Sequence, residues 1–482
     1  MIKLLANFYT IVLGILALYA LHITILIVLY LRHKREPIPP LPSLPESAMP
    51  SVTVQVPLRN EQYVVKRVIQ AIAALEWPQE KLEIQILDDS SDETTALAKL
   101  EAAKLQTQGL DIKVLHRTKP QGHKAGALAK GLQKTKGEFI AIFDADFCPA
   151  PDFLKRTVPH LAANPQLGMV QARWGHLNAR ASAITQAQAL LLDAHFTVEH
   201  IARNRSNLLM NFNGTAGVWR RKAIETSGGW QSDTVAEDLD LSYRAQLQGW
   251  KILYLPNVVA NAELPPLITA FKQQQYRWAK GAAQVFRKLI KPILTSPKLN
   301  VAQKLMASLH LSAYITQPLF LLMLILTLPV ILYSPSLPNL AAILGTLLMI
   351  PPLLYILGQV ELYNDWPKRI LSYPVVMLLG MGISWNNTLA LIDGLTHWGG
   401  PFVRTPKVPA HVKKSERQPH TIKWDRKILG DLCLGIYASV AFWQALNIGA
   451  ENLMPLTAIY AGGEALVLWT TLAQANLPQY PK

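Results

Sequence analysis

Two long stretches of this chain contain neither lysine nor arginine. One lies between Lys304 and Lys368, the other lies between Lys427 and Lys482, and both consist largely of apolar residues. Each is long enough for two helices of about 20 residues, the length that crosses a bilayer. The formal net charge of +15 is therefore gathered between the apolar stretches, as in membrane proteins and unlike in nucleic-acid-binding proteins. We expect a protein embedded in a lipid bilayer, without a nucleic-acid partner.

The amino terminus adds a further apolar run, from about Ala6 to Tyr30, followed by the basic cluster Arg32–Arg35. This run is long enough to span a bilayer, and it lacks the short core and the cleavage site of a signal peptide. We therefore predict an uncleaved transmembrane anchor at residues 1–32, with the segment after it in the cytoplasm. Residues 33–50 are rich in proline and predict a stiff, extended linker.

From Ser51 the pattern changes to strands that alternate with helices. Val52–Pro57 and Leu82–Leu87 are typical of strands, and the segment from Tyr63 to Leu75 has helical periodicity. This alternation predicts an α/β domain at residues 51–290, with a mixed, mostly parallel sheet and helices on both faces. Ligands of such sheets bind at the carboxyl ends of the strands, which is where Asp88 and Asp89 lie.

A second acidic pair ends the apolar strand that begins at Phe139. Asp144 and Asp146 are spaced i, i+2, which places both carboxylates on the same side of an extended chain. Two such carboxylates suit Mg²⁺ or Mn²⁺, because these cations prefer oxygen ligands and complete their shell with phosphate oxygens and water. The alternative is a pair of solvated aspartates. Lys124 lies in a loop with two glycines before a helix, where it would either meet a diphosphate or simply begin the helix.

Several short segments follow one another in a characteristic order. They are VPLRNE (Val56–Glu61), LDDS (Leu87–Ser90), HKAGA (His123–Ala127), DAD (Asp144–Asp146), NGTAGVWR (Asn213–Arg220), ED (Glu237–Asp238) and QQYRW (Gln274–Trp278). In this order they resemble the motifs of processive family 2 glycosyltransferases, and most of all those of the cellulose-synthase-like mannan and glucomannan synthases. The resemblance implies that the α/β domain is a nucleotide-sugar-binding domain of the GT-A type.

The resemblance also implies roles for the matching residues. An inverting sugar transfer needs a base for the acceptor hydroxyl and positive charge for the departing nucleotide diphosphate. Asp238 matches the family's base, with Asp240 as its rival. Asp146 matches the metal ligand, and Asp144 matches the residue nearer the metal or the donor ribose.

Asp89 matches the carboxylate that reads the nucleotide base, with its neighbour Asp88 as a rival. Within a predicted amphipathic helix from Phe271 to Leu289, Arg277 would neutralise the diphosphate and Trp278 would present an aromatic face to the acceptor sugar. The basic face of that helix would also suit a surface helix on anionic lipid, and both roles could hold at once. The other substrate-binding residues that the resemblance implies are Pro57, Glu61, Lys124 and Gln274.

Beyond residue 290 the sequence again contains apolar segments that are long enough to span a bilayer. We predict helix pairs at residues 291–367 and 428–482, with spans at Leu305–Tyr333, Asn339–Val360, Leu429–Asn447 and Leu453–Leu472.

Ile370–Thr396 is apolar enough to span, but the basic segment 399–427 after it is a strong cytoplasmic signal. We therefore predict five spans and, within residues 368–427, a broken interfacial helix that is interrupted near Pro374 and Gly380/Gly382. Phe402–Lys407 resembles in part the cytosolic gating loop of cellulose synthases. It would otherwise be a basic loop on the membrane surface.

These features predict a multi-pass plasma-membrane enzyme whose catalytic domain faces the cytoplasm. It would transfer a hexose from UDP-glucose or GDP-mannose, with Mg²⁺ or Mn²⁺, to a growing β-linked polysaccharide and export the product. Accessory export proteins or a homo-oligomer would be its protein partners. The alternatives are a single transfer to a lipid acceptor of the ceramide or diacylglycerol type, and an export channel whose soluble domain only binds nucleotide. Two cysteines, Cys148 and Cys433, argue against a disulfide framework.

Overall fold

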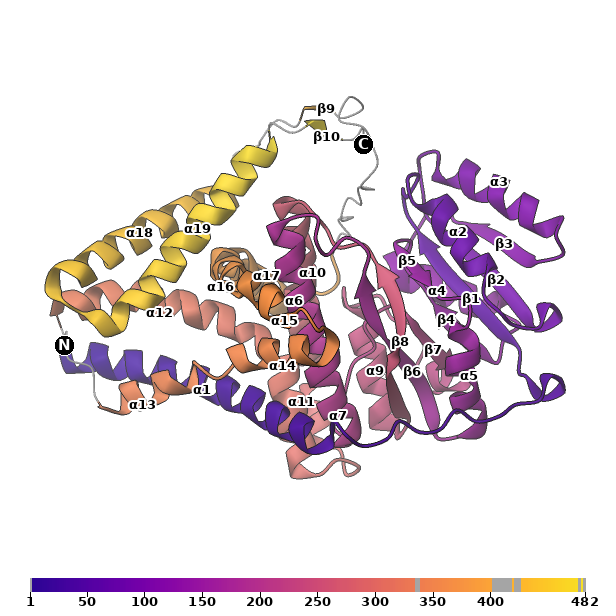
Figure 1. Cartoon of the computed structure of the whole chain (residues 1–482), viewed down its shortest axis with the longest axis horizontal. Coiled ribbons are helices and arrows are strands. Elements are labelled where there is room, and N and C mark those ends of the chain that lie inside the picture. Colours follow the sequence, from indigo (N-terminus) through magenta and orange to yellow (C-terminus); the bar gives the residue numbers. More distant parts are fainter. Residues whose placement is uncertain (1, 334–338, 401–417, 420–425, 476–477, 480–482) are drawn as a thin grey trace.

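The computed structural model describes residues 2–333, 339–400, 418–419, 426–475 and 478–479. Figure 1 shows an α/β domain on one side and a group of long helices on the other, with α6 (Ala183–Ala194) and α10 (Ile268–Thr295) between them. The carboxyl-terminal helices α18 (Arg426–Ile448) and α19 (Met454–Ala475) lie with the long helices, on the side of the molecule away from the sheet.

An eight-stranded sheet in the order β3-β2-β1-β4-β7-β6-β8-β5 forms the centre of the α/β domain. Strand β1 pairs in parallel with β2 and β4, β2 with β3, and β6 with β8. The pairs β4–β7, β6–β7 and β5–β8 are antiparallel, so the predicted mixed sheet is present. The strands are β1 (Val52–Leu58), β2 (Leu82–Asp88), β3 (Asp111–His116), β4 (Phe139–Ile142), β5 (Phe147–Pro149), β6 (Leu167–His176), β7 (Gly217–Arg220) and β8 (Lys251–Ala262).

Helices cover both faces of this sheet. In β4, Phe139 and Ala141 pack into the core beneath α2 and α5, whereas Ile140 and Ile142 pack into the core beneath α4, α8 and α9. A strand that is buried on both faces has a continuous apolar sequence, and β4 has such a sequence. The helices of the domain are α2 (Val65–Ala73), α3 (Thr94–Gln106), α4 (His123–Lys134), α5 (Phe153–Ala163), η3 (His195–Glu199), α7 (His200–Arg205), α8 (Arg221–Thr226) and α9 (Glu237–Gln248).

The strand that begins at Phe139 is shorter than its apolar sequence suggests. It ends at Ile142, and the chain turns at Ala145 and Asp146, where the Phe147 N–H donates to the Asp144 carbonyl over 3.0 Å. The prediction that both carboxylates lie along an extended chain is therefore wrong. The turn separates β4 from β5, which pairs with β8 at the edge of the sheet.

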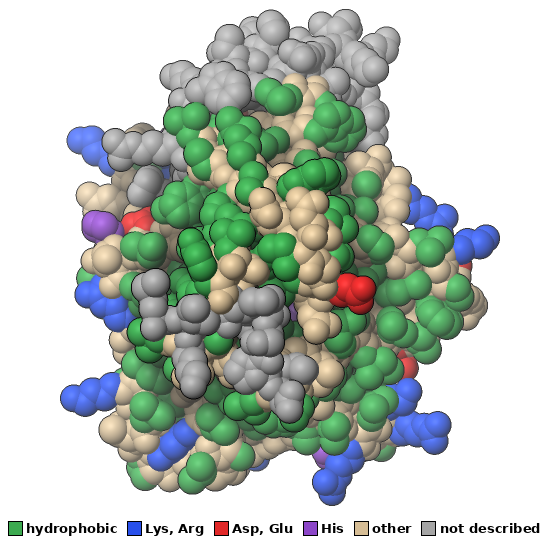
Figure 2. All heavy atoms as spheres, turned by 90° about the vertical axis from the view of Figure 1, so that its left-hand side faces the viewer, with side chains coloured by type: hydrophobic (Ala, Val, Ile, Leu, Met, Phe, Trp, Pro, Cys, Tyr) green, Lys and Arg blue, Asp and Glu red, His purple; other side chains and the backbone are tan. Residues whose placement is uncertain are grey.

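Within the described part of the chain, five helices are long and apolar enough to cross a membrane: Leu4–His33, Ala313–Tyr333, Ile343–Leu362, Ile428–Ile448 and Glu451–Gln474. Figure 2 shows the side of the molecule that carries the ends of these helices, with hydrophobic side chains over the centre and most Lys and Arg side chains toward the edge. The elements of this region are α1 (Ile2–His33), α11 (Val301–Leu311), α12 (Thr316–Tyr333), α13 (Asn339–Leu347), α14 (Pro352–Leu362), α15 (Trp366–Arg369), α16 (Tyr373–Gly382), α17 (Ser384–Thr396), α18 and α19.

Two predicted spans begin later than the sequence suggests. The stretch from Leu305 is divided between α11 and the apolar helix that starts at Ala313, and the stretch from Asn339 is divided between α13 and α14. In the second case Pro351 and Pro352 lie at the start of α14, where proline is tolerated although it ends the preceding helix.

The segment Trp366–Thr396 is bent by 49° between α16 and α17. The break falls at Ile383, next to Gly382, whereas Pro374 lies in the first turn of α16 and does not interrupt it. A Cβ on Gly382 would lie 2.4 Å from the Gly463 carbonyl of α19, so close helix packing requires glycine there. Phe402–Lys407 and most of the basic segment lie outside the described residues.

Candidate active site

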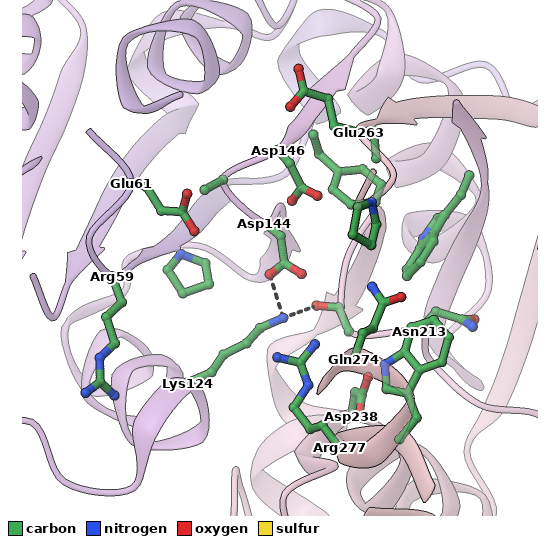
Figure 3. Close-up of a pocket in the computed structure, with 18 of the residues that line it drawn as sticks. Arg59, Glu61, Lys124, Asp144, Asp146, Asn213, Asp238, Glu263, Gln274 and Arg277 are labelled. Carbon is green, nitrogen blue, oxygen red and sulfur yellow. Dashed lines mark hydrogen bonds and ion pairs between the residues drawn. The ribbon is translucent and has the colours of Figure 1, made fainter. Parts of the chain in front are cut away.

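One pocket lies at the edge of the sheet where β1, β2 and β4 end, and Figure 3 shows it. Every site residue that the sequence predicts contributes to its lining. These residues are Pro57, Glu61, Asp89, Lys124, Asp144, Asp146, Asp238, Gln274, Arg277 and Trp278. They come from segments far apart in the chain, so the tertiary structure brings the whole predicted set together.

Lys124 lies near the centre of this pocket, in the first turn of α4. Its Nζ donates to Asp144 Oδ1 over 2.6 Å and to the Gly214 carbonyl over 2.9 Å, and it lies 3.9 Å from Glu237 Oε1. Burial disfavours the charge on Lys124, but Asp144 and Glu237 outweigh that cost and raise the pKa of the ammonium group. The lysine is therefore a permanent cation among carboxylates.

The turn before α4 holds Lys124 in place. Gly122 has a positive φ of 71°, and a Cβ on Gly126 would lie 2.0 Å from the Gln121 carbonyl oxygen. Both glycines of the predicted loop are thus required by the backbone path. The prediction that Lys124 precedes the helix is wrong by two residues, because α4 begins at His123 and Lys124 is its second residue.

Asp238 lines the pocket from the first turn of α9, next to Glu237. Burial raises the pKa of Asp238, although Lys124 and the Leu239 N–H, which donates to Oδ1 over 2.8 Å, oppose the rise. Burial and the Asp238 charge raise the pKa of Glu237 to about 7. Gly214 faces this pair with a φ of 82°, and a Cβ there would lie 2.7 Å from Asp238 Oδ2. Both carboxyl groups of the pair therefore have raised pKa values.

Asp240, the rival of Asp238, has a different environment. It is fully buried outside the pocket lining, and its carboxylate pairs with Arg244 at 2.7 Å and Lys288 at 3.0 Å. A carboxylate that is held by two cations stabilises the packing of α9 against α10 and is not accessible to a substrate. The structure thus separates two aspartates that are nearly adjacent in the sequence.

Asp88 and Asp89 also lie in different environments. Asp88 is buried and accepts hydrogen bonds from the Ser90 N–H at 3.0 Å, the Thr95 hydroxyl at 2.6 Å and His116 Nδ1 at 2.8 Å. Asp89 lines the pocket, where Arg117 Nε donates to its Oδ1 over 2.6 Å and Arg117 Nη2 donates to its Oδ2. This fork holds the Asp89 carboxylate in one orientation at the pocket wall.

Helix α10 carries Gln274, Arg277 and Trp278 into the pocket and is tied to its neighbours by its basic residues. Lys272 pairs with Asp431 of α18 at 2.5 Å, and Lys280 pairs with Asp393 of α17 at 2.7 Å. The Arg287 guanidinium lies 4.2 Å from the Trp398 ring, and Lys288 pairs with Asp233 at 2.8 Å. These cations face protein partners, so the alternative of a helix whose basic face rests on anionic lipid is not supported.

Asp144 and Asp146 both line the pocket and provide the oxygen donors that a hard divalent cation requires. Among the described residues, no group of three or more His, Cys, Asp and Glu side chains has an arrangement that would hold a metal by itself. A metal held at this pair would therefore need further oxygens from a bound ligand, and the diphosphate of a nucleotide sugar would supply them. The donor set fits such a shared site.

The sequence assigned no role to several residues that also line this pocket. These are Leu58, Arg59, His123, Trp174, His176, Leu192, Asn213, Glu237, Glu263, Pro265 and Pro266. Trp174 and His176 lie at the carboxyl end of β6, so the rule that ligands bind at strand ends could have indicated them. No sequence pattern indicated a role for Arg117, which orients Asp89, because the two residues lie 28 positions apart.

Comparisons with known proteins agree with this geometry. Residues 50–281 match the family described as Glycosyltransferase like family 2. Glucomannan 4-beta-mannosyltransferase 2 of Arabidopsis thaliana is 43% identical over 262 residues, which are 54% of this chain and 49% of that protein. Probable glucomannan 4-beta-mannosyltransferase 3 of Oryza sativa subsp. japonica is 35% identical over 417 residues, which are 84% of this chain and 75% of that protein. The chain thus spans about half the length of the first of these relatives.

Among solved structures, the mannosyltransferase PcManGT from Pyrobaculum calidifontis, in complex with GDP-Man and Mn2+, superposes with a TM-score of 0.51. Its sequence is 22% identical, and the match covers 82% of this chain and 99% of that one. This likeness shows the fold, and with the family match it confirms the GT-A type domain that the sequence predicts.

Proposed function

The chain belongs to glycosyltransferase family 2, and we propose that it is a membrane-embedded, inverting mannosyltransferase that extends a β-linked polysaccharide of the mannan or glucomannan type. One observation carries this proposal. A half-buried carboxylate with a raised pKa (Asp238), a cation (Lys124) and an aromatic ring (Trp278) line the same pocket. These are the groups that a sugar transfer from a nucleotide diphosphate requires.

The transfer is a single displacement at the anomeric carbon of the donor sugar. Asp238 takes the proton of the acceptor hydroxyl, and the freed oxygen forms a bond to the anomeric carbon as the bond to the diphosphate breaks. Lys124 and Arg277 neutralise the charge of the departing nucleotide diphosphate, and Asp89 holds its base. A Mg²⁺ or Mn²⁺ ion held by Asp144 and Asp146 would add Lewis-acid stabilisation of the leaving diphosphate.

The names of the relatives support a choice of donor and acceptor. These relatives are named glucomannan 4-beta-mannosyltransferases, so we propose GDP-mannose as the donor and a β-1,4-linked chain as the acceptor. Trp278 would stack against the apolar face of the terminal pyranose of that chain.

The five apolar helices make this a membrane protein in our proposal, with the catalytic domain on the cytoplasmic face of the plasma membrane. The basic cluster after α1 supports that orientation, because such clusters mark cytoplasmic segments. The bent α16–α17 pair would lie in the interface, between transmembrane pairs at 291–367 and 428–482. The product would then leave through the spans, with or without accessory proteins.

The test is incubation of the enzyme, purified in lipid nanodiscs, with labelled GDP-mannose or labelled UDP-glucose, a divalent cation and a β-1,4-mannotetraose primer. We expect label from GDP-mannose in a polymer that an endo-β-1,4-mannanase degrades, and none with the Asp238→Asn variant. Label only from UDP-glucose would contradict the donor, and label in the solvent-extractable lipid fraction would contradict the polymer acceptor.

A further inference from the structure

One wall of the pocket contains an imidazole that the proposed chemistry does not use. His176 is the last residue of β6 and lines the pocket together with Trp174, Leu192 and Trp278. In the sheet, β6 is separated from β4 by β7, which is antiparallel to both, so β4 and β6 end at the same edge. His176 thus lies at the same edge of the sheet as Glu61, Asp89 and Asp144, and β7 separates its strand from the strands that precede those three residues.

The imidazole is held by a carboxylate behind the wall. His176 Nε2 lies 3.1 Å from Oδ1 of Asp193, at the end of α6, and both side chains are buried. Asp193 Oδ2 also accepts from Gln359 Nε2 over 2.9 Å, and the Tyr363 hydroxyl lies 3.4 Å from Oδ1. An ionised carboxylate can only accept, so Nε2 of His176 carries a hydrogen atom, and in this tautomer of the neutral ring Nδ1 is an acceptor.

Gln359 belongs to α14, within one of the apolar helices, so this network joins the pocket wall to the membrane region. The approach of the two elements is close, because a Cβ on Gly358 would lie 3.0 Å from the Cα of Ala194.

The chain beyond His176 is also fixed. Asn178 exchanges two hydrogen bonds with the backbone of Leu264, at 2.7 and 2.8 Å, beside the lining residue Pro265.

Two properties therefore distinguish this wall from the rest of the pocket. The groups proposed to hold the nucleotide diphosphate and its metal, Lys124, Arg277 and Asp144, come from α4, α10 and the turn after β4. His176 and Trp174 come from β6, and Trp174 packs against the hydrophobic cluster that contains residues of α1 and α14. The wall combines a single oriented polar group with apolar side chains, as in sites that bind uncharged hydroxylated ligands.

We propose that His176 binds the acceptor sugar, with its Nδ1 accepting a hydrogen bond from a hydroxyl of the terminal pyranose. Asp193 and Gln359 act as positioning residues that fix the ring in the orientation for this contact. This inference rests on the proposed function, because it assigns the acceptor end of the same pocket. It adds a residue that selects and aligns the acceptor, in addition to the ring of Trp278.

If His176 makes this contact, its loss should weaken binding of the acceptor and leave binding of the donor unchanged. Loss of one hydrogen bond to an uncharged hydroxyl weakens binding by about tenfold. His176→Ala should therefore raise the KM for β-1,4-mannotetraose by about tenfold at saturating GDP-mannose, and leave the KM for GDP-mannose unchanged. His176→Asn should recover most of that loss, because its Oδ1 would lie near the position of Nδ1.

Gln359→Leu tests the positioning role. It removes one donor to Asp193 but no group from the pocket, so we expect a KM for mannotetraose that lies between those of the wild type and His176→Ala. His160→Ala is the matched control, because it truncates a buried histidine on α5 that does not line the pocket. We expect the wild-type KM for both substrates in this control.

Binding of mannotetraose in the presence of GDP, measured by calorimetry on the full-length enzyme in nanodiscs, judges the inference even without turnover. The inference is supported if the wild type binds mannotetraose and His176→Ala binds it about tenfold more weakly while Asn restores binding. It is overturned if His176→Ala binds mannotetraose as the wild type does, or if its only change is a lower melting temperature. Absence of transfer by the wild type would instead contradict the proposed function.

Discussion

The Nζ atom of Lys124 lies 2.6 Å from Oδ1 of Asp144, although the two residues are 20 positions apart in the chain. This pair joins the first turn of α4 to the turn after β4, and it places a cation beside the acidic motif (Figure 3). Because Glu237 lies 3.9 Å from the same ammonium group, Lys124 also connects that motif to the α9 carboxylates. Lys124 therefore lies between the proposed binding site of the diphosphate and the helix that carries the proposed catalytic base, Asp238.

The acidic motif gives the first prediction, which concerns the metal. Asp146→Ala should abolish transfer and metal-dependent binding of GDP, because it removes one of the two carboxylates available to the cation. The measurements are transfer of labelled mannose and GDP calorimetry with and without Mn²⁺. Asp152→Ala, a half-exposed carboxylate at the start of α5, is the control and should behave as the wild type. Full activity of the wild type in excess EDTA would disprove the metal assignment.

The second prediction separates the two aspartates of α9. Asp238→Asn keeps the shape of the side chain but removes the base, so transfer should fall by about 10²- to 10⁴-fold while GDP-mannose binding stays within threefold. Asp240→Asn breaks a buried pair with Arg244 and Lys288, and such losses cost about 3–5 kcal/mol of stability. A thermal melt of both variants checks this. A stable Asp240→Asn enzyme without transfer would mean that the base is Asp240.

The third prediction is a pH dependence. Asp238 must be ionised to accept a proton, and burial raises its pKa while the pKa of Glu237 is raised to about 7. The kcat/KM should therefore rise with pH, with a midpoint above the ordinary aspartate pKa. Glu237→Gln removes a neighbouring acid whose negative charge opposes ionisation of Asp238, so the rise should move to lower pH. Profiles from pH 4.5 to 9 with an unchanged midpoint in this variant would contradict the coupling.

The fourth prediction concerns the nucleotide base. Asp89→Ala should weaken GDP binding by about tenfold or more, because it removes an oriented carboxylate from the pocket. Asp88→Asn should lower the melting temperature and leave GDP affinity within threefold, since Asp88 is buried and bonded to Ser90, Thr95 and His116. Calorimetry and thermal melts of both variants distinguish the two roles. Loss of GDP binding only in Asp88→Asn would reverse the assignment.

The fifth prediction concerns the side of the membrane on which the basic segment lies. If the bent α16–α17 pair is interfacial, Ser415 faces the cytoplasm, although it lies outside the described residues. A single cysteine at Ser415, with Cys148 and Cys433 replaced, should resist an impermeant maleimide in intact cells and react after lysis. Labelling in intact cells would show that the pair crosses the membrane, and it would remove the gating-loop hypothesis.

The sequence alone determined the positions of several strands and ten of the residues that line the site. Val52–Leu58 and Leu82–Asp88 are strands within a residue of their predicted bounds, because side-chain periodicity and strand propensity act over a few neighbouring residues. The order of the motifs was enough to reveal the resemblance to family 2 glycosyltransferases, and that resemblance implied all ten predicted lining residues.

Only the tertiary structure could decide between neighbours with the same chemistry. Asp238 and Asp240 differ because Lys288 of α10 reaches one of them, and Asp88 and Asp89 differ because His116 and Arg117 hold them on different sides of the strand end. Likewise, Lys272 is a partner of Asp431, which lies 159 residues away, and not a lipid-facing cation. Burial and charge pairing depend on distances in space between segments that are remote in the chain, and no local pattern contains those distances.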